Sequence, residues 1–255
     1  MRGLFFMLVL RWRSFMAKAL KIRRKPEKPA APSPPAFRKY TRLAVAIDML
    51  QKQRITLLEP TTWEDKNDSW FMQEYKDIIG ATTLLATCFA QTEDTHHHWH
   101  VFSAGMDGVC IEFDKAKILS AFNGIDGVRK GQVVYRKIDT LRRRDRIEPE
   151  ELPFLKRRPY KPECEYRVIY VENSDEPIES KSFGISVDWI NRITLSPWMP
   201  ASLRLSVSKT LKAIEECQDL EIVRSTLFSN RDWRALTRKA RPNSTRVRKP
   251  PTKIK

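Results

Sequence analysis

The stretch 162–170 places two carboxylates two residues apart inside an otherwise apolar pattern that is typical of a β-strand. Side chains alternate between the two faces of a strand, so the pattern predicts that Glu163, Glu165 and Arg167 share one face. Residues two apart on such a face are separated by roughly 7 Å. Enzymes that cleave glycosidic bonds hold their acidic pairs about 5 to 9.5 Å apart. The stretch therefore predicts either a carboxylate pair that acts on a sugar, or an exposed sheet face on which Glu165 and Arg167 solvate each other.

Short segments of this β type recur along the chain, each rich in β-branched or aromatic side chains and bounded by Gly, Pro, Asp or Asn. We expect strands over residues 37–40, 54–58, 83–90, 108–113, 132–136, 163–171, 193–196 and 220–224. The segments do not alternate regularly with helical patterns, which argues against a doubly wound parallel sheet.

Apolar residues at helical spacing predict two helices among these strands. The first begins after Thr41, its expected N-cap, and places apolar residues at 43, 46, 47 and 50. The second begins near Pro200 and carries apolar residues between 203 and 214. Residues 138–161 are charged and irregular, which predicts a mobile loop or a small insertion.

The fold class that follows is α+β, a single domain of short mixed strands with a few packed helices over residues 37–236. Residues 1–36 form a basic, proline-rich extension, and its segment 26–35 has the composition of an extended linker. Residues 237–255 have the composition of a basic disordered tail.

The formal net charge of +16 belongs to the two ends of the chain. Residues 1–36 carry nine Lys or Arg against one acid, and residues 237–255 carry eight against none. Removing these from the totals of 47 and 31 leaves 30 basic and 30 acidic residues in the domain. Basic tails bind polyanions without sequence preference, so we expect at most non-specific nucleic-acid contact through them.

The four cysteines are widely spaced and form no C-x-x-C pair, which favours free thiols in a reducing, cytoplasmic compartment. The apolar run 4–10 is too short to span a bilayer, which needs about 20 residues. It also lacks a cleavage site, so a weak interfacial anchor or a start at Met16 explains it better than export. We expect no transmembrane segment.

All four histidines lie in the segment 96–100. Adjacent ligands diverge in an extended segment, and no cysteine or carboxylate stands at a matching spacing, so we expect a polar loop there and no metal site. The sequence contains no glycine-rich phosphate loop, no G-x-S-x-G and no H-E-x-x-H. The common signatures of nucleotide-binding proteins, hydrolases and metalloproteases are therefore absent.

An ordered set of short motifs over about residues 37 to 235 resembles the bacterial family described as domain of unknown function 2971. The motifs are Tyr40-Thr41, Pro60-x-x-Trp63-x-Asp65, Cys88-Phe89, Trp99-x-x-Phe102, Asp107-Gly108-Val109-Cys110-Ile111-Glu112-Phe113, Val134-Tyr135, Glu163-x-Glu165-Tyr166-Arg167 and Glu221-Ile222-x-x-Ser225. The chain departs from the family at Glu64-Asp65-Lys66, where members have Asn-Asp-Pro, at Phe102, where they have Tyr, and at 104–106, where they have an aromatic platform. The family name states no activity.

More remotely, the order of elements resembles that of ADP-ribosyltransferase folds. Such folds begin with a strand that bears a basic or His residue, continue with a Thr-initiated helix, and end with a strand that carries Glu-x-Glu or Gln-x-Glu. Arg38 or Lys39 takes the first position in this chain, Thr41 the second, and Glu163-x-Glu165 the last. The resemblance implies that Glu165 steadies an oxocarbenium ion while Glu163 orients the acceptor.

The first function that follows is an NAD-dependent ADP-ribosyltransferase or NAD glycohydrolase of the effector or defence type. Glu165 and Glu163 would be catalytic, Arg38 or Lys39 would hold the phosphates, and NAD would be the substrate. The acceptor would be a protein or a nucleic acid. The candidates for the aromatic ring that stacks on nicotinamide are Tyr40, Trp63, Phe89 and Trp99.

The second function belongs to a different class: a non-catalytic binding module whose basic tails contact nucleic acid while its neutral domain recognises another protein. A structural domain without a small-molecule site is a third reading. Binding of NAD favours the enzyme, because a ligand that binds only the folded state raises the melting temperature.

Overall fold

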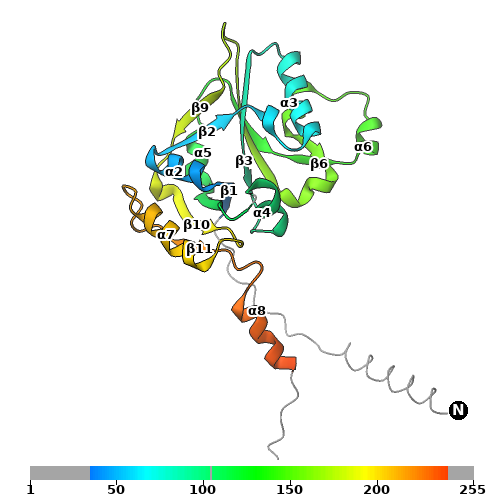
Figure 1. Cartoon of the computed structure of the whole chain (residues 1–255). Coiled ribbons are helices and arrows are strands. Elements are labelled where there is room, and N and C mark those ends of the chain that lie inside the picture. Colours follow the sequence, from blue (N-terminus) through cyan, green and yellow to red (C-terminus); the bar gives the residue numbers. More distant parts are fainter. Residues whose placement is uncertain (1–34, 104, 241–255) are drawn as a thin grey trace, which may run out of the picture. The chain divides into compact units, whose positions relative to one another are not determined.

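A nine-stranded mixed sheet lies at the centre of the computed structural model, which describes residues 35–103 and 105–240 (Figure 1). The strands follow the order β11-β10-β4-β1-β3-β2-β9, and β8 pairs with β3 and with β5. Their bounds are β1 Ala36–Arg42, β2 Arg54–Leu58, β3 Thr83–Ala90, β4 Gly108–Asp114, β5 Val128–Gln132, β8 Glu165–Glu172, β9 Ser180–Gly184, β10 Ile190–Leu195 and β11 Ile222–Arg224. Most of the predicted extension 1–36 and the end of the predicted tail lie outside the described residues.

The sheet forks at β3. On one side β3 pairs with β8 over its whole length, from Thr83 to Ala90. On the other side it pairs with β1 at Ala90 and with β2 at Ala86, four residues away. The strands β1 and β2 therefore diverge from one central strand and leave its edge uncovered between them.

Helices cover both faces of this sheet (Figure 1). The α-helices are α2 Leu43–Gln51, α3 Lys66–Ile78, α4 His96–Phe102, α5 Lys115–Ser120, α6 Ile138–Arg142, α7 Ala201–Lys212 and α8 Arg231–Ala235. The 3-10 helices are η1 Pro60–Thr62, η2 Pro149–Phe154, η3 Arg158–Glu163, η4 Val187–Trp189 and η5 Leu236–Ala240. A separate pair of short parallel strands, β6 Val134–Arg136 and β7 Leu155–Arg157, is formed by residues between β5 and β8 in the sequence.

Alternation along the strands divides the core into two layers. Leu85 of β3 and Val168 of β8 belong to the larger apolar cluster, which also contains most of the buried phenylalanines. Their neighbours Leu84 and Ile169 point the other way, into a smaller cluster beneath α3 that contains Met72. Because both faces are covered, β3 is buried almost throughout.

The predicted α+β class with a single domain is confirmed, and the bounds predicted for β2 and β3 match the structure. Residues 138–161 contain α6, η2, β7 and the beginning of η3, so the mobile loop that was one of the two predictions for this segment is wrong. The N-cap prediction for Thr41 is wrong. Thr41 is still paired with Val109 in the β1–β4 ladder, so the helix begins one residue later, after Arg42, without a side-chain cap.

The other predicted strands differ from the structure in their bounds, as at β10, which begins three residues before the predicted 193, and two of these differences bear on the site. The strand expected over 132–136 is two strands in different sheets, β5 and β6. The Val133 N–H still donates to the Glu165 carbonyl in the β5–β8 register, but the Glu165 N–H donates to the Tyr135 hydroxyl instead of returning the bond, so the ladder ends there. The strand expected over 163–171 begins at Glu165, and Glu163 is the last residue of η3. No helix among the residues that the structure describes is long and apolar enough to cross a membrane.

Candidate active site

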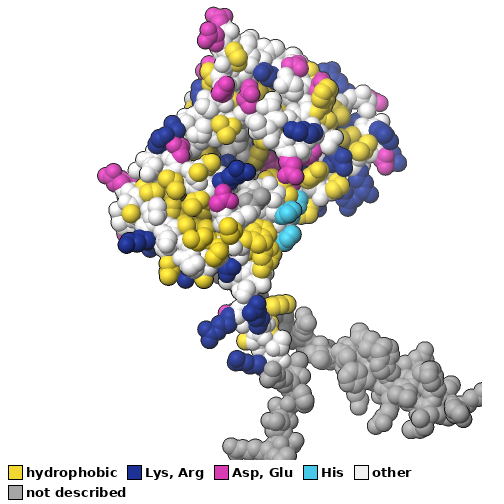
Figure 2. Space-filling view, viewed as in Figure 1, with side chains coloured by type: hydrophobic (Ala, Val, Ile, Leu, Met, Phe, Trp, Pro, Cys, Tyr) yellow, Lys and Arg dark blue, Asp and Glu magenta, His cyan; other side chains and the backbone are white. Residues whose placement is uncertain are grey.

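A cavity of about 660 Å³ opens where β1 and β2 diverge from β3. Its wall includes consecutive residues of β1 and β3, the end of α4, and residues that surround η1 and η3. Figure 2 shows a hollow on this face between basic and acidic side chains, with histidine side chains of α4 beside it. The volume lies within the range of about 300–1,000 Å³ that is usual for small-molecule sites.

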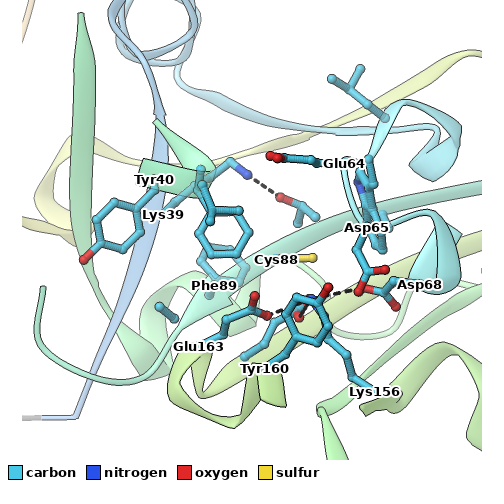
Figure 3. Close-up of a pocket in the computed structure, with 18 of the residues that line it drawn as sticks. Lys39, Tyr40, Glu64, Asp65, Asp68, Cys88, Phe89, Lys156, Tyr160 and Glu163 are labelled. Carbon is cyan, nitrogen blue, oxygen red and sulfur yellow. Dashed lines mark hydrogen bonds and ion pairs between the residues drawn. The ribbon is translucent and has the colours of Figure 1, made fainter. Parts of the chain in front are cut away.

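The carboxylates of the predicted motif lie in this cavity together with a lysine that the sequence did not single out. Lys156 Nζ lies 2.7 Å from Glu163 Oε2 and 3.3 Å from Glu165 Oε2. It also lies 3.2 Å from Oδ2 of Asp68 on α3. One ammonium group therefore holds three carboxylates together, and Figure 3 shows Asp68, Lys156 and Glu163 gathered at one end of the cavity.

Arg167 completes this buried ion cluster, which we define as Asp68, Lys156, Glu163, Glu165 and Arg167. Its guanidinium group lies 2.8 Å from both Glu165 Oε1 and Asp68 Oδ2. Arg167 also donates to the Pro153 carbonyl at 2.7 Å, and its guanidinium carbon lies 4.8 Å from the Trp63 ring centroid. Arg167 is 0% exposed, Glu163 2% and Glu165 5%, which excludes the alternative of a solvated sheet face.

A left-handed residue brings the two glutamates together. Cys164 has φ 47°, so the chain turns between η3 and β8 instead of continuing as a strand. Its carbonyl accepts from the Gln91 N–H at 3.0 Å, which fixes this turn against the end of β3. The convergence of Glu163 and Glu165 was predicted, but strand alternation is not its cause.

The two glutamates differ in their affinity for protons. Burial opposes ionisation of Glu165, but Arg167 and Lys156 outweigh burial and hold its pKa at about 2. Burial raises the pKa of Glu163 above its usual value, although Lys156 and His97 partly oppose this. Two carboxylates whose pKa values move in opposite directions are suited to different roles, one as a fixed anion and the other as a proton acceptor.

The two basic residues of β1 are placed differently, although both contribute to the cavity wall. Arg38 lies 2.7 Å from a carboxylate oxygen of Glu112 and donates to the Thr92 carbonyl at 2.8 Å. Lys39 donates to Thr87 Oγ1 at 2.7 Å, and no carboxylate within the described part of the chain lies within 4.0 Å of its ammonium group. Burial lowers the pKa of Lys39. Lys39 is therefore the better placed of the two to meet an anion.

Of the aromatic residues predicted for the site, all but one contribute to the cavity wall. Tyr40, Trp63 and Phe89 line the cavity, as does Tyr160, which the sequence did not single out. Trp99 is completely buried outside the cavity lining, and its indole N–H donates to Asp94 at 3.0 Å. The structure thus places Trp99 in the core beside the site.

The histidine segment is a helix, so the loop predicted there is wrong. Thr95 caps α4 by accepting from the His98 N–H, which lets the segment fold without an apolar pattern of its own. His97 Nε2 lies 3.1 Å from Glu163 Oε1, while the buried His98 bonds the Glu163 carbonyl through Nε2. Two sides of Glu163 are thereby fixed by α4. Within residues 35–103 and 105–240, no group of three or more His, Cys, Asp or Glu is placed to hold a metal ion.

Two solved structures are similar to this chain over about three quarters of its length. DarT from Thermus sp. 2.9 in complex with NAD⁺ matches at a TM-score of 0.39 and 11% identity, over 77% of this chain and 98% of that one. The complex of the same protein with carba-NAD⁺ matches at 0.38 and 12%, over 76% and 97%. No protein-family model and no curated protein matches the sequence.

Proposed function

We propose that this protein cleaves the bond between nicotinamide and ribose in NAD, as an ADP-ribosyltransferase or NAD glycohydrolase of the effector or defence type. The observation that carries the proposal is the pair Glu163 and Glu165, buried side by side in a ligand-sized cavity with opposite shifts in pKa. Membership of the family described as domain of unknown function 2971 is part of the same proposal and rests on the ordered motifs.

Glu165 is the fixed anion in this mechanism. As the bond from ribose to nicotinamide breaks, nicotinamide leaves with the electron pair and positive charge develops on the sugar. A carboxylate that stays ionised because Arg167 and Lys156 hold its pKa at about 2 stabilises that charge without having to reorganise. Its low basicity also keeps it ionised throughout the reaction.

Glu163 is the proton acceptor. The acceptor group, or water in the case of hydrolysis, attacks the sugar carbon through oxygen, and its proton passes to the Glu163 carboxylate. Burial raises the pKa of Glu163, and a base is most effective when its pKa lies near the working pH. His97 Nε2 at 3.1 Å orients the carboxylate from the partly exposed side of the cavity.

Lys39 is the proposed phosphate contact. Its ammonium group faces the cavity and has no carboxylate partner among the described residues, whereas Arg38 is already paired with Glu112. Among the aromatic residues of the wall, Tyr40 and Phe89 are buried and stack on His98 and Phe37. Trp63 and Tyr160 are only partly buried, so they are the rings best placed to meet nicotinamide or adenine.

The test is nicotinamide release from NAD by purified full-length protein, with and without cell lysate as a source of acceptors. We expect Glu165→Gln to lower turnover by roughly a hundredfold or more while the fold persists, because the exchange keeps the shape and removes the charge. Glu172→Gln, on the same strand but outside the cavity lining, is the matched control. No release by the wild type, together with no change of melting temperature by NAD, would refute the proposal.

The basic residues at both ends of the chain favour a second candidate, a binding module for nucleic acid. It rests on the charge count alone, with eight basic residues and no acid in 237–255. Duplex DNA or RNA that stabilises the protein at low salt, only while these ends are present and without any effect of NAD, would favour this module over the enzyme.

A further inference from the structure

A second cavity, of about 420 Å³, lies next to the first. The two share Asp65, Asp68 and Lys156 in their walls. The rest of the second wall comes from α3, α6, the β6–β7 pair and the segment between α6 and η2. Figure 1 shows α3, α6 and β6 on one side of the sheet. Its apolar residues are Phe71, Ile138, Leu141, Ile147 and Leu155.

Two arginines of this wall stand opposite each other. In the parallel pair of β6 and β7, Arg136 is in register with Arg157, and both line the second cavity. Both are exposed, and neither has a carboxylate within 4.0 Å in the described ranges. Glu151, whose pKa Arg136 helps to lower, is held by Arg144 at 2.6 Å. Like charges placed opposite each other on neighbouring strands destabilise a sheet. An anion bound between the two guanidinium groups would reduce their electrostatic repulsion.

The charge of the surrounding segment has the same sign. Residues 136–158 carry nine Lys or Arg against five acids, inside a domain whose 30 basic and 30 acidic residues balance. A third arginine, Arg142 of α6, also lines the cavity, and its ion pair with Asp139 is long, at 3.6 Å. A local excess of positive charge around a concave wall attracts anions.

We propose that the second cavity binds a nucleoside phosphate, with the phosphate between Arg136 and Arg157 and the base against the apolar wall. Guanidinium groups bind phosphate through paired, charge-assisted hydrogen bonds, which suits two arginines side by side. The volume is sufficient for one nucleotide by the usual size of ligand sites. The ligand is either a free nucleotide or one nucleotide of a single strand. The proposal does not depend on cleavage of NAD.

The experiment is calorimetric titration of the full-length protein with AMP, adenosine and inorganic phosphate. We expect AMP to bind more tightly than either fragment. The double variant Arg136→Gln, Arg157→Gln should weaken AMP binding by roughly tenfold or more, since it removes charge-assisted hydrogen bonds. Arg143→Gln, an exposed arginine of the same segment that does not line the cavity, is the matched control and should bind AMP as the wild type does.

Three further measurements locate the ligand and identify its source. Lys39→Gln changes the first cavity only, so loss of AMP binding in that variant but not in the double variant would overturn the proposal. The double variant should melt about 1–3 °C higher than the wild type without ligand, because it removes the repulsion. A hexadeoxyadenylate that loses affinity in parallel with AMP identifies a single strand as the source, whereas loss for AMP alone identifies a free nucleotide.

The proposal fails if AMP does not bind at millimolar concentration, or if the double variant binds it as tightly as the wild type does. Ile138→Ser gives a second check on the apolar wall, because it removes the apolar side chain without adding a charge. Ile138 is 51% exposed, so its replacement should leave the fold intact. Weaker binding of AMP with unchanged binding of inorganic phosphate is the expected result, because only the base contacts that part of the wall.

Discussion

Lys156 Nζ lies 2.7 Å from Glu163 Oε2, and both side chains are almost completely buried. Lys156 also contacts Glu165 and Asp68, so its single positive charge compensates two carboxylates from the turn between η3 and β8 and a third from α3. Removing one partner of a buried ion pair leaves an uncompensated charge, which costs more free energy than the pair contributes. Lys156 is thus required for the two glutamates to stay buried side by side.

We therefore expect Lys156→Met to lower the free energy of unfolding by about 3–5 kcal/mol. The loss should be smaller at acidic pH, where protonation of Glu163 removes part of the uncompensated charge. Urea denaturation at several pH values measures both effects. Lys161→Met, an exposed lysine of η3, is the control and should change stability by less than about 0.5 kcal/mol. Wild-type stability of Lys156→Met would show that the buried ion cluster does not need this ammonium group.

The pH dependence of stability should distinguish the two glutamates. The folded pKa of Glu165 is about 2, below its usual 4.5, so its stabilising contribution is present above pH 4.5 and is lost as the pH falls toward 2. Glu163 has a raised folded pKa, so its contribution has the opposite sign and decreases as the pH rises above 4.5. In urea titrations, Glu165→Gln should flatten the loss of stability between pH 4.5 and pH 2, whereas Glu163→Gln should remove a loss of stability that the wild type shows as the pH rises above 4.5. Identical slopes for the two variants would contradict this assignment.

Replacing Lys39 should change the KM for NAD, whereas replacing Arg38 should change the stability of the fold. Lys39→Gln should raise the KM for NAD by roughly tenfold or more, because a charge-assisted hydrogen bond to phosphate is lost. Arg38→Gln should mainly reduce stability, since it removes the 2.7 Å ion pair with Glu112 and leaves Arg192, at 3.1 Å, as the remaining partner of that carboxylate. Steady-state kinetics and thermal melting of the two variants provide the comparison. A larger effect of Arg38→Gln on KM would assign the phosphate contact to Arg38 instead.

The strand β4 carries much of the core. Ile111 is 0% exposed and belongs to the larger apolar cluster, so Ile111→Ala should cost about 2–5 kcal/mol through the cavity it leaves. Leu205→Ala on α7 is the control, because Leu205 is 66% exposed. Chemical denaturation of both variants should separate them clearly, and equal midpoints would place β4 outside the cooperative core.

Elements with a strong local pattern were predictable from the sequence. The run Thr83–Ala90 consists of β-branched, apolar and aromatic residues throughout, and its predicted bounds are those of β3. The helices α3 and α4 were missed for a common reason. Each begins at a side-chain cap, Asp65 or Thr95, and each buries a polar residue, Asp68 or His98, where an apolar residue would have extended the apolar face. Tertiary contacts decide these helices, and a periodicity search does not detect such contacts.

The candidate site was predictable in part. Glu163 and Glu165 were found because charge inside an apolar stretch is unusual, and the residues that bring them together were not. Nothing near Lys156 distinguishes it from the other basic residues of an irregular segment, and Asp68 lies on an unpredicted helix. The left-handed Cys164 carries no sequence signal either, because the usual residue with positive φ is glycine.

The buried ion cluster holds three carboxylates and two cations, so one negative charge is left when all five groups are ionised. The nicotinamide ring of NAD⁺ is positively charged, and free nicotinamide is neutral. In the proposed reaction, the negative charge of the cluster attracts the cationic ring of the substrate. This attraction ends when the bond breaks, because the released nicotinamide is neutral. One excess carboxylate would thus favour both the binding of substrate and the release of nicotinamide, and neither step would need a conformational change.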